Sequence, residues 1–152
     1  SGTASGSYHG NFGALALGGT GASVYRNNIE FGADVPIKVG DWVSTETGNM
    51  VGPTKQGISY RYNQDPTATF ATVARDSSRI MVVPVIQSLE VSGRNEVLVV
   101  GFAAFFLESS NVSNGEVTGR FMQMVTPGDP GSGDGGNYGL YASRLIPYAS
   151  VF

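Results

Sequence analysis

Residues 95–107 read NEVLVVGFAAFFL and form the most hydrophobic element of the chain. After Glu96 the run carries no charge, and apolar residues occupy both alternating faces. A strand with one solvated face would instead alternate between apolar and polar residues. The segment therefore predicts a buried central strand, around which the rest of the fold is built.

The runs that flank this segment predict strands that pair with it. Residues 79–89 (RIMVVPVIQSL) are apolar and β-branched, and Pro84 within them indicates an edge position or a bulge. Residues 92–95 (SGRN) have the composition of a hairpin turn, and a second turn leads into residues 116–125 (EVTGRFMQMV). The three runs predict an antiparallel meander, with a bulge near Gly119 in the last strand.

The first half of the chain predicts shorter elements. Residues 22–31 fit a short helix or turn, and residues 35–43 (VPIKVGDWV) predict a strand, a turn at Gly40-Asp41 and a second strand. Residues 53–62 are the best helix candidate, because proline is tolerated at the first helical position and Asn49 or Gly52 is available as a cap.

The length of 152 residues suits one domain with a single core. Residues 1–11 (SGTASGSYHGN) are either a flexible Gly/Ser-rich lead-in or a strand exchanged with a neighbour, and residues 12–152 form one β-rich domain. Strand-like residues 138–152 close the chain. The predicted fold is mainly β, a single-domain antiparallel β-barrel or sandwich with one or two short helices.

Composition narrows the classes of function. Nine basic residues are scattered among 12 acidic ones, so the chain has no electrostatic footprint for nucleic acid. Charged residues make up 14% of the chain against roughly 25% in typical soluble domains, and 22 glycines are about twice the usual share. Many secreted and cell-surface β proteins have such compositions, and we expect an extracellular or cell-surface location. No run approaches the roughly 20 apolar residues of a membrane span.

The sequence lacks residues that most common catalytic sites and metal sites require. His9 is the only histidine and cysteine is absent, which leaves a Ser-His-Asp triad entirely dependent on His9 and effectively excludes structural zinc. No Ser-x-x-Lys spacing precedes Lys38 or Lys55, which argues against a Ser-Lys catalytic dyad. The glycine-rich residues 18–21 are not followed by the lysine of a phosphate loop, which argues against a nucleotide site. We expect no catalytic residue and no enzymatic activity.

Carboxylates offer the remaining chemistry. A glycosidase-type acid and nucleophile could be drawn from four residues, Glu30, Asp34, Asp41 and Glu46. Asp41 after Gly40 also fits a turn former whose side chain caps its own backbone.

Residues 128–137 (GDPGSGDGGN) offer calcium ligands through Asp129, Asp134 and Asn137, although their spacing departs from an EF-hand loop. A solvated surface loop is the alternative for this segment. We expect no cofactor, with calcium as the one candidate. Asn111-Val112-Ser113 matches the pattern of a glycosylation acceptor.

Glycine and core positions carry a family resemblance. Residues 10–19 (GNFGALALGG), 25–29 (YRNNI), 45–54 (TETGNMVGPT) and 99–107 (VVGFAAFFL), together with 39–41 (VGD) and 117–119 (VTG), resemble the extracytoplasmic region of proteins related to the TadE/TadG components of the tight-adherence (Tad/Flp) pilus system. The resemblance implies an exported domain that follows an upstream membrane helix, with no catalytic residue. Its implied partners are other copies of itself or pilus and cell-envelope proteins.

Two classes of function follow. The favoured one is a non-enzymatic extracellular structural or assembly protein, either pilus-associated or itself a filament subunit. The alternative is an exported carbohydrate-binding module or a carboxylate-dependent glycoside hydrolase. Residues 1–17 and 145–152 have the composition to add as strands to the sheet edge of another copy, or to pair within their own domain.

Overall fold

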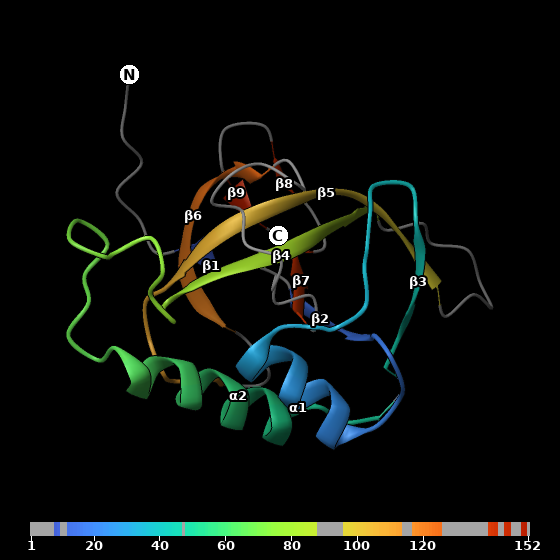
Figure 1. The fold of residues 1–152 in the computed structure, drawn as a ribbon, viewed down its shortest axis with the longest axis horizontal. Coiled ribbons are helices and arrows are strands. Elements are labelled where there is room, and N and C mark those ends of the chain that lie inside the picture. Colours follow the sequence, from blue (N-terminus) through green and yellow to red (C-terminus); the bar gives the residue numbers. More distant parts are fainter. Residues whose placement is uncertain are drawn as a thin grey trace.

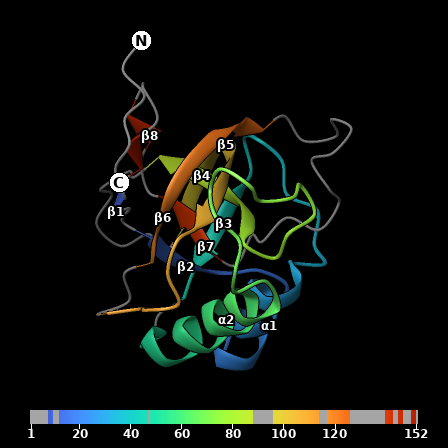
Figure 2. The same ribbon diagram turned by 90° about the vertical axis from the view of Figure 1, so that its left-hand side faces the viewer.

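The computed structural model describes residues 8–9, 12–46, 48–87, 96–113, 117–125, 140–142, 145–146 and 150–151. It confirms a mainly β chain with two helices. Helices α1 (Ala22–Phe31) and α2 (Val51–Gln64) lie side by side on one side of a strongly curved sheet (Figures 1 and 2). No helix among the described residues is long and apolar enough to span a membrane.

One seven-stranded sheet has the order β1-β6-β5-β3-β2-β7-β4, and β4 also pairs with β5. A separate two-stranded sheet joins β8 to β9. The strands are β1 (Tyr8–His9), β2 (Phe12–Ala16), β3 (Trp42–Thr45), β4 (Ile80–Gln87), β5 (Glu96–Leu107), β6 (Thr118–Val125), β7 (Leu140–Ala142), β8 (Leu145–Ile146) and β9 (Ser150–Val151).

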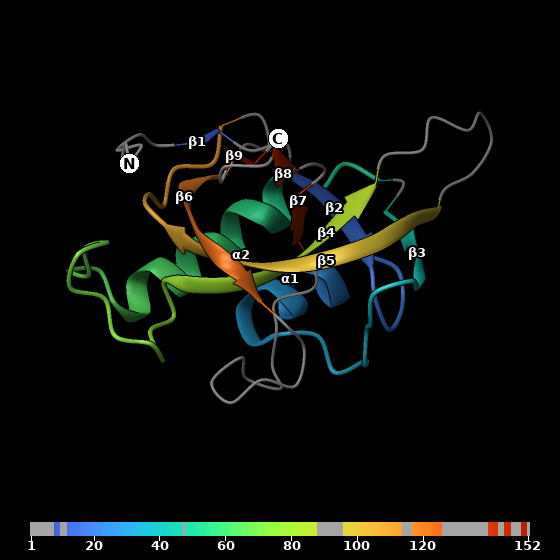
Figure 3. The same ribbon diagram turned by 90° about the horizontal axis from the view of Figure 1, so that it is seen from above.

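Strand β5 is the centre of the sheet, as its sequence predicts. It pairs antiparallel with β4 along one edge, while β3 and β6 share the other edge at opposite ends of the strand (Figure 3). Residues 101–107 are all buried. The predicted meander of β4, β5 and β6 is confirmed, although the turn at residues 92–95 lies outside the described part of the chain.

The sheet is sandwich-like rather than a barrel. In the described part of the chain β4 meets β7 at a single parallel pair, Val85 with Ala142, so the strands do not close into a regular barrel. Each face of β5 has its own apolar cluster. One contains Ala103, Phe105 and Leu107 with helix residues Tyr25, Ile29 and Ile58, and the other contains Val99 and Phe102 with Leu15, Val43 and Ile86. Burial on both faces explains the unbroken apolar run.

The two helices approach closely because a glycine lies between them. A Cβ atom on Gly57 would sit 2.7 Å from Cγ2 of Ile29, so only glycine fits this contact. The Tyr25 hydroxyl and Thr54 Oγ1 are 2.7 Å apart in the same interface. Helix α2 begins at Val51, two residues before the predicted start, so its N-cap is Met50 and Gly52 lies inside the helix. Asn49 lies one position before the cap, where its Oδ1 accepts the Val51 N–H at 3.0 Å.

The predicted strand at residues 35–39 is wrong. Val35 is half-buried and Ile37 is buried, which reproduces an alternating pattern, but strand structure begins only at Trp42. Residues 38–41 form a turn in which the Asp41 N–H donates to the Lys38 carbonyl at 3.1 Å, and Gly40 has a φ of 96°. The turn itself is as predicted.

Bulges occur in two places. The pairing of β4 with β5 shifts between Val85 and Ile86, but the extra residue is Val100 of β5, so this bulge lies in the partner strand and not in the strand that carries Pro84. The pairing of β5 with β6 shifts so that Met122 is the extra residue, and the bulge predicted near Gly119 is therefore three positions out. A Cβ atom on Gly119 would collide with the Phe105 ring and the Phe106 carbonyl, so this glycine serves close packing.

The described parts of both chain ends pair within the chain. Tyr8 and His9 of β1 lie opposite Gly119 and Thr118 of β6. Strand β2 pairs with β3 and β7, and β8 pairs with β9.

Candidate functional site

Two buried arginines dominate the polar interior. Arg61 lies on the buried face of α2 with Thr54, Gly57 and Ile58, at helical spacing. Its Nε donates to the Ile29 carbonyl at 2.5 Å and its Nη1 to the Ser78 carbonyl at 2.8 Å. Burial lowers the pKa of Arg61 to about 10. The side chain thus satisfies a carbonyl in the last turn of α1 and fixes the chain before β4.

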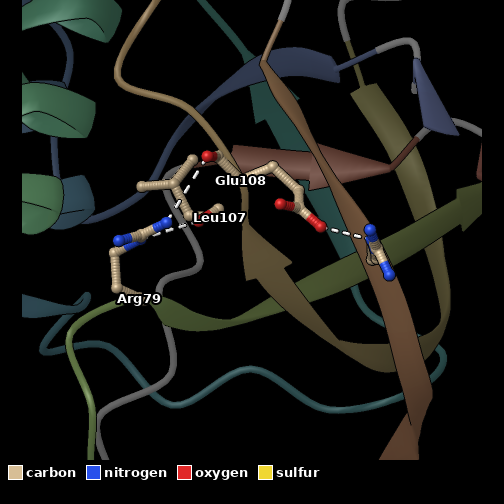
Figure 4. A network of polar contacts seen from close by, with 4 residues as sticks. Arg79, Leu107 and Glu108 are labelled. Atoms are coloured by element: carbon tan, nitrogen blue, oxygen red, sulfur yellow. Dashed lines mark hydrogen bonds and ion pairs between the residues drawn. The ribbon is translucent and has the colours of Figure 1, made fainter. Parts of the chain in front are cut away.

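Arg79, at 2% exposure, is the more enclosed of the two. Its guanidinium donates to the carbonyl of Leu107 at 2.7 Å and more weakly to that of Glu108 at 3.4 Å (Figure 4). It also donates to the carbonyl of Asp65 at 2.9 Å. The same group lies 4.0 Å from the centre of the Tyr62 ring and 5.0 Å from that of Phe106. Carbonyl oxygens and ring faces together offset the loss of hydration.

Aromatic rings connect Arg79 to a second charged pair. The Phe70 ring meets the Phe106 ring edge-on at 5.9 Å, and the Arg120 guanidinium lies 5.0 Å over Phe70. Arg120 also forms an ion pair with the side chain of Glu108. We call Tyr62, Phe70, Arg79, Phe106, Glu108 and Arg120 the Arg79 network.

Phe70 lies in the loop formed by residues 65–79, whose two ends are hydrogen-bonded to each other. The Ser77 hydroxyl donates to Asp65 Oδ2 at 2.6 Å, and Arg79 donates to the Asp65 carbonyl, so both ends of residues 65–79 are held together. The three hydrogen bonds that the Arg79 guanidinium donates all go to main-chain carbonyls. The network therefore holds the loop against the sheet.

The four candidate carboxylates lie in structural roles or in solvent. Glu30 forms an ion pair with Arg26 one turn earlier in α1, with 3.7 Å between Oε1 and Nε. Glu46 accepts the Gly21 N–H at 3.2 Å, which places a negative charge at the amino end of α1. Asp41 Oδ2 accepts the Lys38 N–H at 3.0 Å, as predicted for a turn former, and Asp34 is exposed.

The predicted calcium ligands Asp129, Asp134 and Asn137 lie outside the described residues. Among the residues that are described, no group of three or more histidine, cysteine or acidic side chains could hold a metal ion. His9 is placed by its main chain alone, opposite Thr118. Asn111 of the glycosylation pattern is exposed, and its N–H donates to Ser109 Oγ at 3.0 Å.

Large apolar side chains reach solvent in several places. Phe31 at the end of α1 is 64% exposed and meets the Tyr60 ring of α2 edge-on, with 5.2 Å between ring centres. The other exposed apolar residues in the described part of the chain are Val39, Trp42, Val51, Phe70, Val100 and Met124.

No protein-family model, no curated protein and no solved structure matches the chain. Sequence reasoning missed both buried arginines. Arg61 had a detectable signal, because it completes the spacing 54, 57, 58, 61 of one helical face. Arg79 had none, because its acceptors come from residues 65, 107 and 108.

Proposed function

We propose that this chain is a non-enzymatic structural or assembly domain of the cell surface, pilus-associated or itself a filament subunit. Its partners would be other copies of itself or pilus and cell-envelope proteins. The resemblance to TadE/TadG-related proteins supports this proposal, and so does the low content of charged residues.

The observation that carries the proposal is the aromatic pair of Phe31 and Tyr60 on the helix layer. A phenylalanine that is 64% exposed gives up most of the free energy it would gain by burial. Phe and Tyr are enriched at protein interfaces, where such side chains become covered. The ends of α1 and α2 thus provide a contact surface for another protein.

The use of charged groups in the described residues supports a non-enzymatic role. Glu46, Asp41 and Asp65 accept hydrogen bonds that fix a helix start, a turn and a loop. The guanidinium groups of Arg61 and Arg79 donate hydrogen bonds to main-chain carbonyls. Residues engaged in this way hold the fold and are poorly suited to move protons to a substrate.

Light scattering after size-exclusion chromatography tests the proposal. The parent protein should form higher-order species whose fraction grows with concentration, and Phe31→Asp should remove them while circular dichroism stays unchanged. Val39→Asp is the matched control, since it adds the same charge at an exposed apolar residue of the 38–41 turn. Equal assembly of the parent and the Phe31 variant would overturn the assignment of this surface.

A second candidate is an exported carbohydrate-binding module. It is favoured by the exposed Trp42, which has the exposed polar residues Ser44 and Glu96 near it in the sheet. The glycoside hydrolase alternative requires two facing carboxylates. It would be revived by turnover of glycan substrates that Asp41→Asn or Glu46→Gln abolishes.

A further inference from the structure

We propose that the sheet face around Trp42 is a binding site for a neutral glycan, with the indole stacked on one sugar ring. The inference deepens the carbohydrate-binding candidate and is independent of assembly through the helix layer. It starts from the position of the chain's single tryptophan, which is 44% exposed at the first residue of β3, opposite Leu98 of β5.

Strand alternation fixes the direction of the indole. Val43, the next residue in β3, is buried in the cluster with Leu15 and Val99, so Trp42 and Ser44 belong to the opposite face. The helices pack against residues 103–107 of β5, whereas β3 pairs with residues 96–98 at the other end of that strand. Trp42, Ser44 and Glu96 on this face are exposed, while Leu98 is half-buried.

The strand register places an apolar floor beside the indole. Trp42 lies opposite Leu98 of β5, and Leu98 lies opposite Gln87 of β4. Paired residues share a face, with Cβ atoms about 5 Å apart. Val100, the extra residue at the β4–β5 bulge, is 44% exposed two positions beyond Leu98. Trp42 and the half-buried Leu98 thus offer a small apolar surface spread over two strands, with the exposed Val100 of the bulge nearby.

Three polar side chains border this surface on the same face. Ser44 lies opposite Glu96, and both are exposed, as is Gln87 at the far side of Leu98. Strand spacing puts Gln87 about 10 Å from Trp42, while Ser44 is about 7 Å along β3. A hydroxyl, a carboxylate and an amide therefore lie around the indole, within reach of a ligand that rests on it. We call Trp42, Ser44, Gln87, Glu96 and Leu98 the Trp42 platform.

This combination matches the chemistry of a sugar. One side of a pyranose ring presents C–H groups that stack on an aromatic face, while its rim presents hydroxyls that pair with amide, carboxylate and hydroxyl groups. An apolar protein surface on the same site would bury the Glu96 charge without a partner. The phosphates of a nucleic acid would meet that charge with the same sign. The borders of the platform thus favour a neutral, hydroxyl-rich ring.

Intrinsic fluorescence reports on this site directly, because Trp42 is the only tryptophan. We expect titration of the full chain with chitohexaose, cellohexaose or maltohexaose to change Trp42 emission saturably for at least one of them. Calorimetry with that sugar should show at least a tenfold loss of affinity in Trp42→Ala, a smaller loss in Trp42→Tyr and a severalfold loss in Glu96→Gln. Phe31→Ala, at an exposed aromatic residue of the helix layer, should bind the sugar as the parent does.

Two results would overturn the proposal. One is the absence of any saturable change with all three sugars. The other is a concentration-dependent blue shift of Trp42 emission without sugar, accompanied by self-association, which would make the platform a contact between copies. Trp42→Ala could lose affinity because it fails to fold. Trp42→Tyr controls for this, because its affinity is compared with that of the parent once its circular dichroism spectrum matches. Because the assembly test uses Phe31 and light scattering, failure of one proposal is distinguishable from failure of the other.

Discussion

Arg79→Met should destabilise the protein by about 3 kcal/mol. The substitution removes two hydrogen bonds from a charged donor, to the carbonyls of Leu107 at 2.7 Å and Asp65 at 2.9 Å, each of a kind that contributes about 1.5–3 kcal/mol. It also removes the guanidinium from between Tyr62 and Phe106. The two bonds together contribute about 3–6 kcal/mol, and relief of the buried charge offsets part of this loss, which leaves a net effect of about 3 kcal/mol.

Thermal and urea unfolding followed by circular dichroism measure this effect. For a domain of this size about 3 kcal/mol corresponds to a fall in Tm of roughly 6–12 °C. Arg26→Met is the matched control: Arg26 is on the surface of α1, 40% exposed at its side chain, and should change stability by less than about 0.5 kcal/mol. If Arg79→Met cost no more than Arg26→Met, the reasoning that Arg79 holds the 65–79 loop to the sheet would be refuted.

Three further changes test the fold. Phe102→Asp should cost several kcal/mol, because it buries an unpaired charge at a position that is 1% exposed; a melting temperature within a degree or two of the parent would contradict the position of β5. Gly119→Ala should lower stability by about 1–3 kcal/mol, since the new methyl group meets the Phe105 ring, and unchanged urea unfolding would exclude that contact. Glu46→Gln should cost about 0.3–1 kcal/mol by removing the charge beside Gly21 at the start of α1, and the loss should shrink in high salt.

The sequence predicted the elements whose signal is local. Strand β5 was recognisable because both of its faces are apolar, and α2 because Pro53 lies in its first turn and Asn49 precedes it. The strand prediction for residues 35–39 was wrong because Ile37 is buried although it lies in an irregular segment that pairs with no strand in the described part of the chain. Alternating burial alone does not establish a strand.

The candidate sites depend on long-range register. Trp42 meets Leu98, and through it Gln87, only because β3 and β4 pair with opposite edges of β5. A shift of one residue in either pairing would turn the neighbouring side chains to the other face. The acceptors of Arg79 are likewise remote in sequence. Neither arrangement has a local pattern from which it could be predicted.

Negative-stain electron microscopy of the native protein, beside its Phe31→Asp variant, tests the proposed assembly function most directly. We expect filaments or regular higher-order particles for the parent and dispersed single particles for the variant, which should remain folded by circular dichroism. Single particles of the parent at high concentration, with no filaments on native cells, would contradict it.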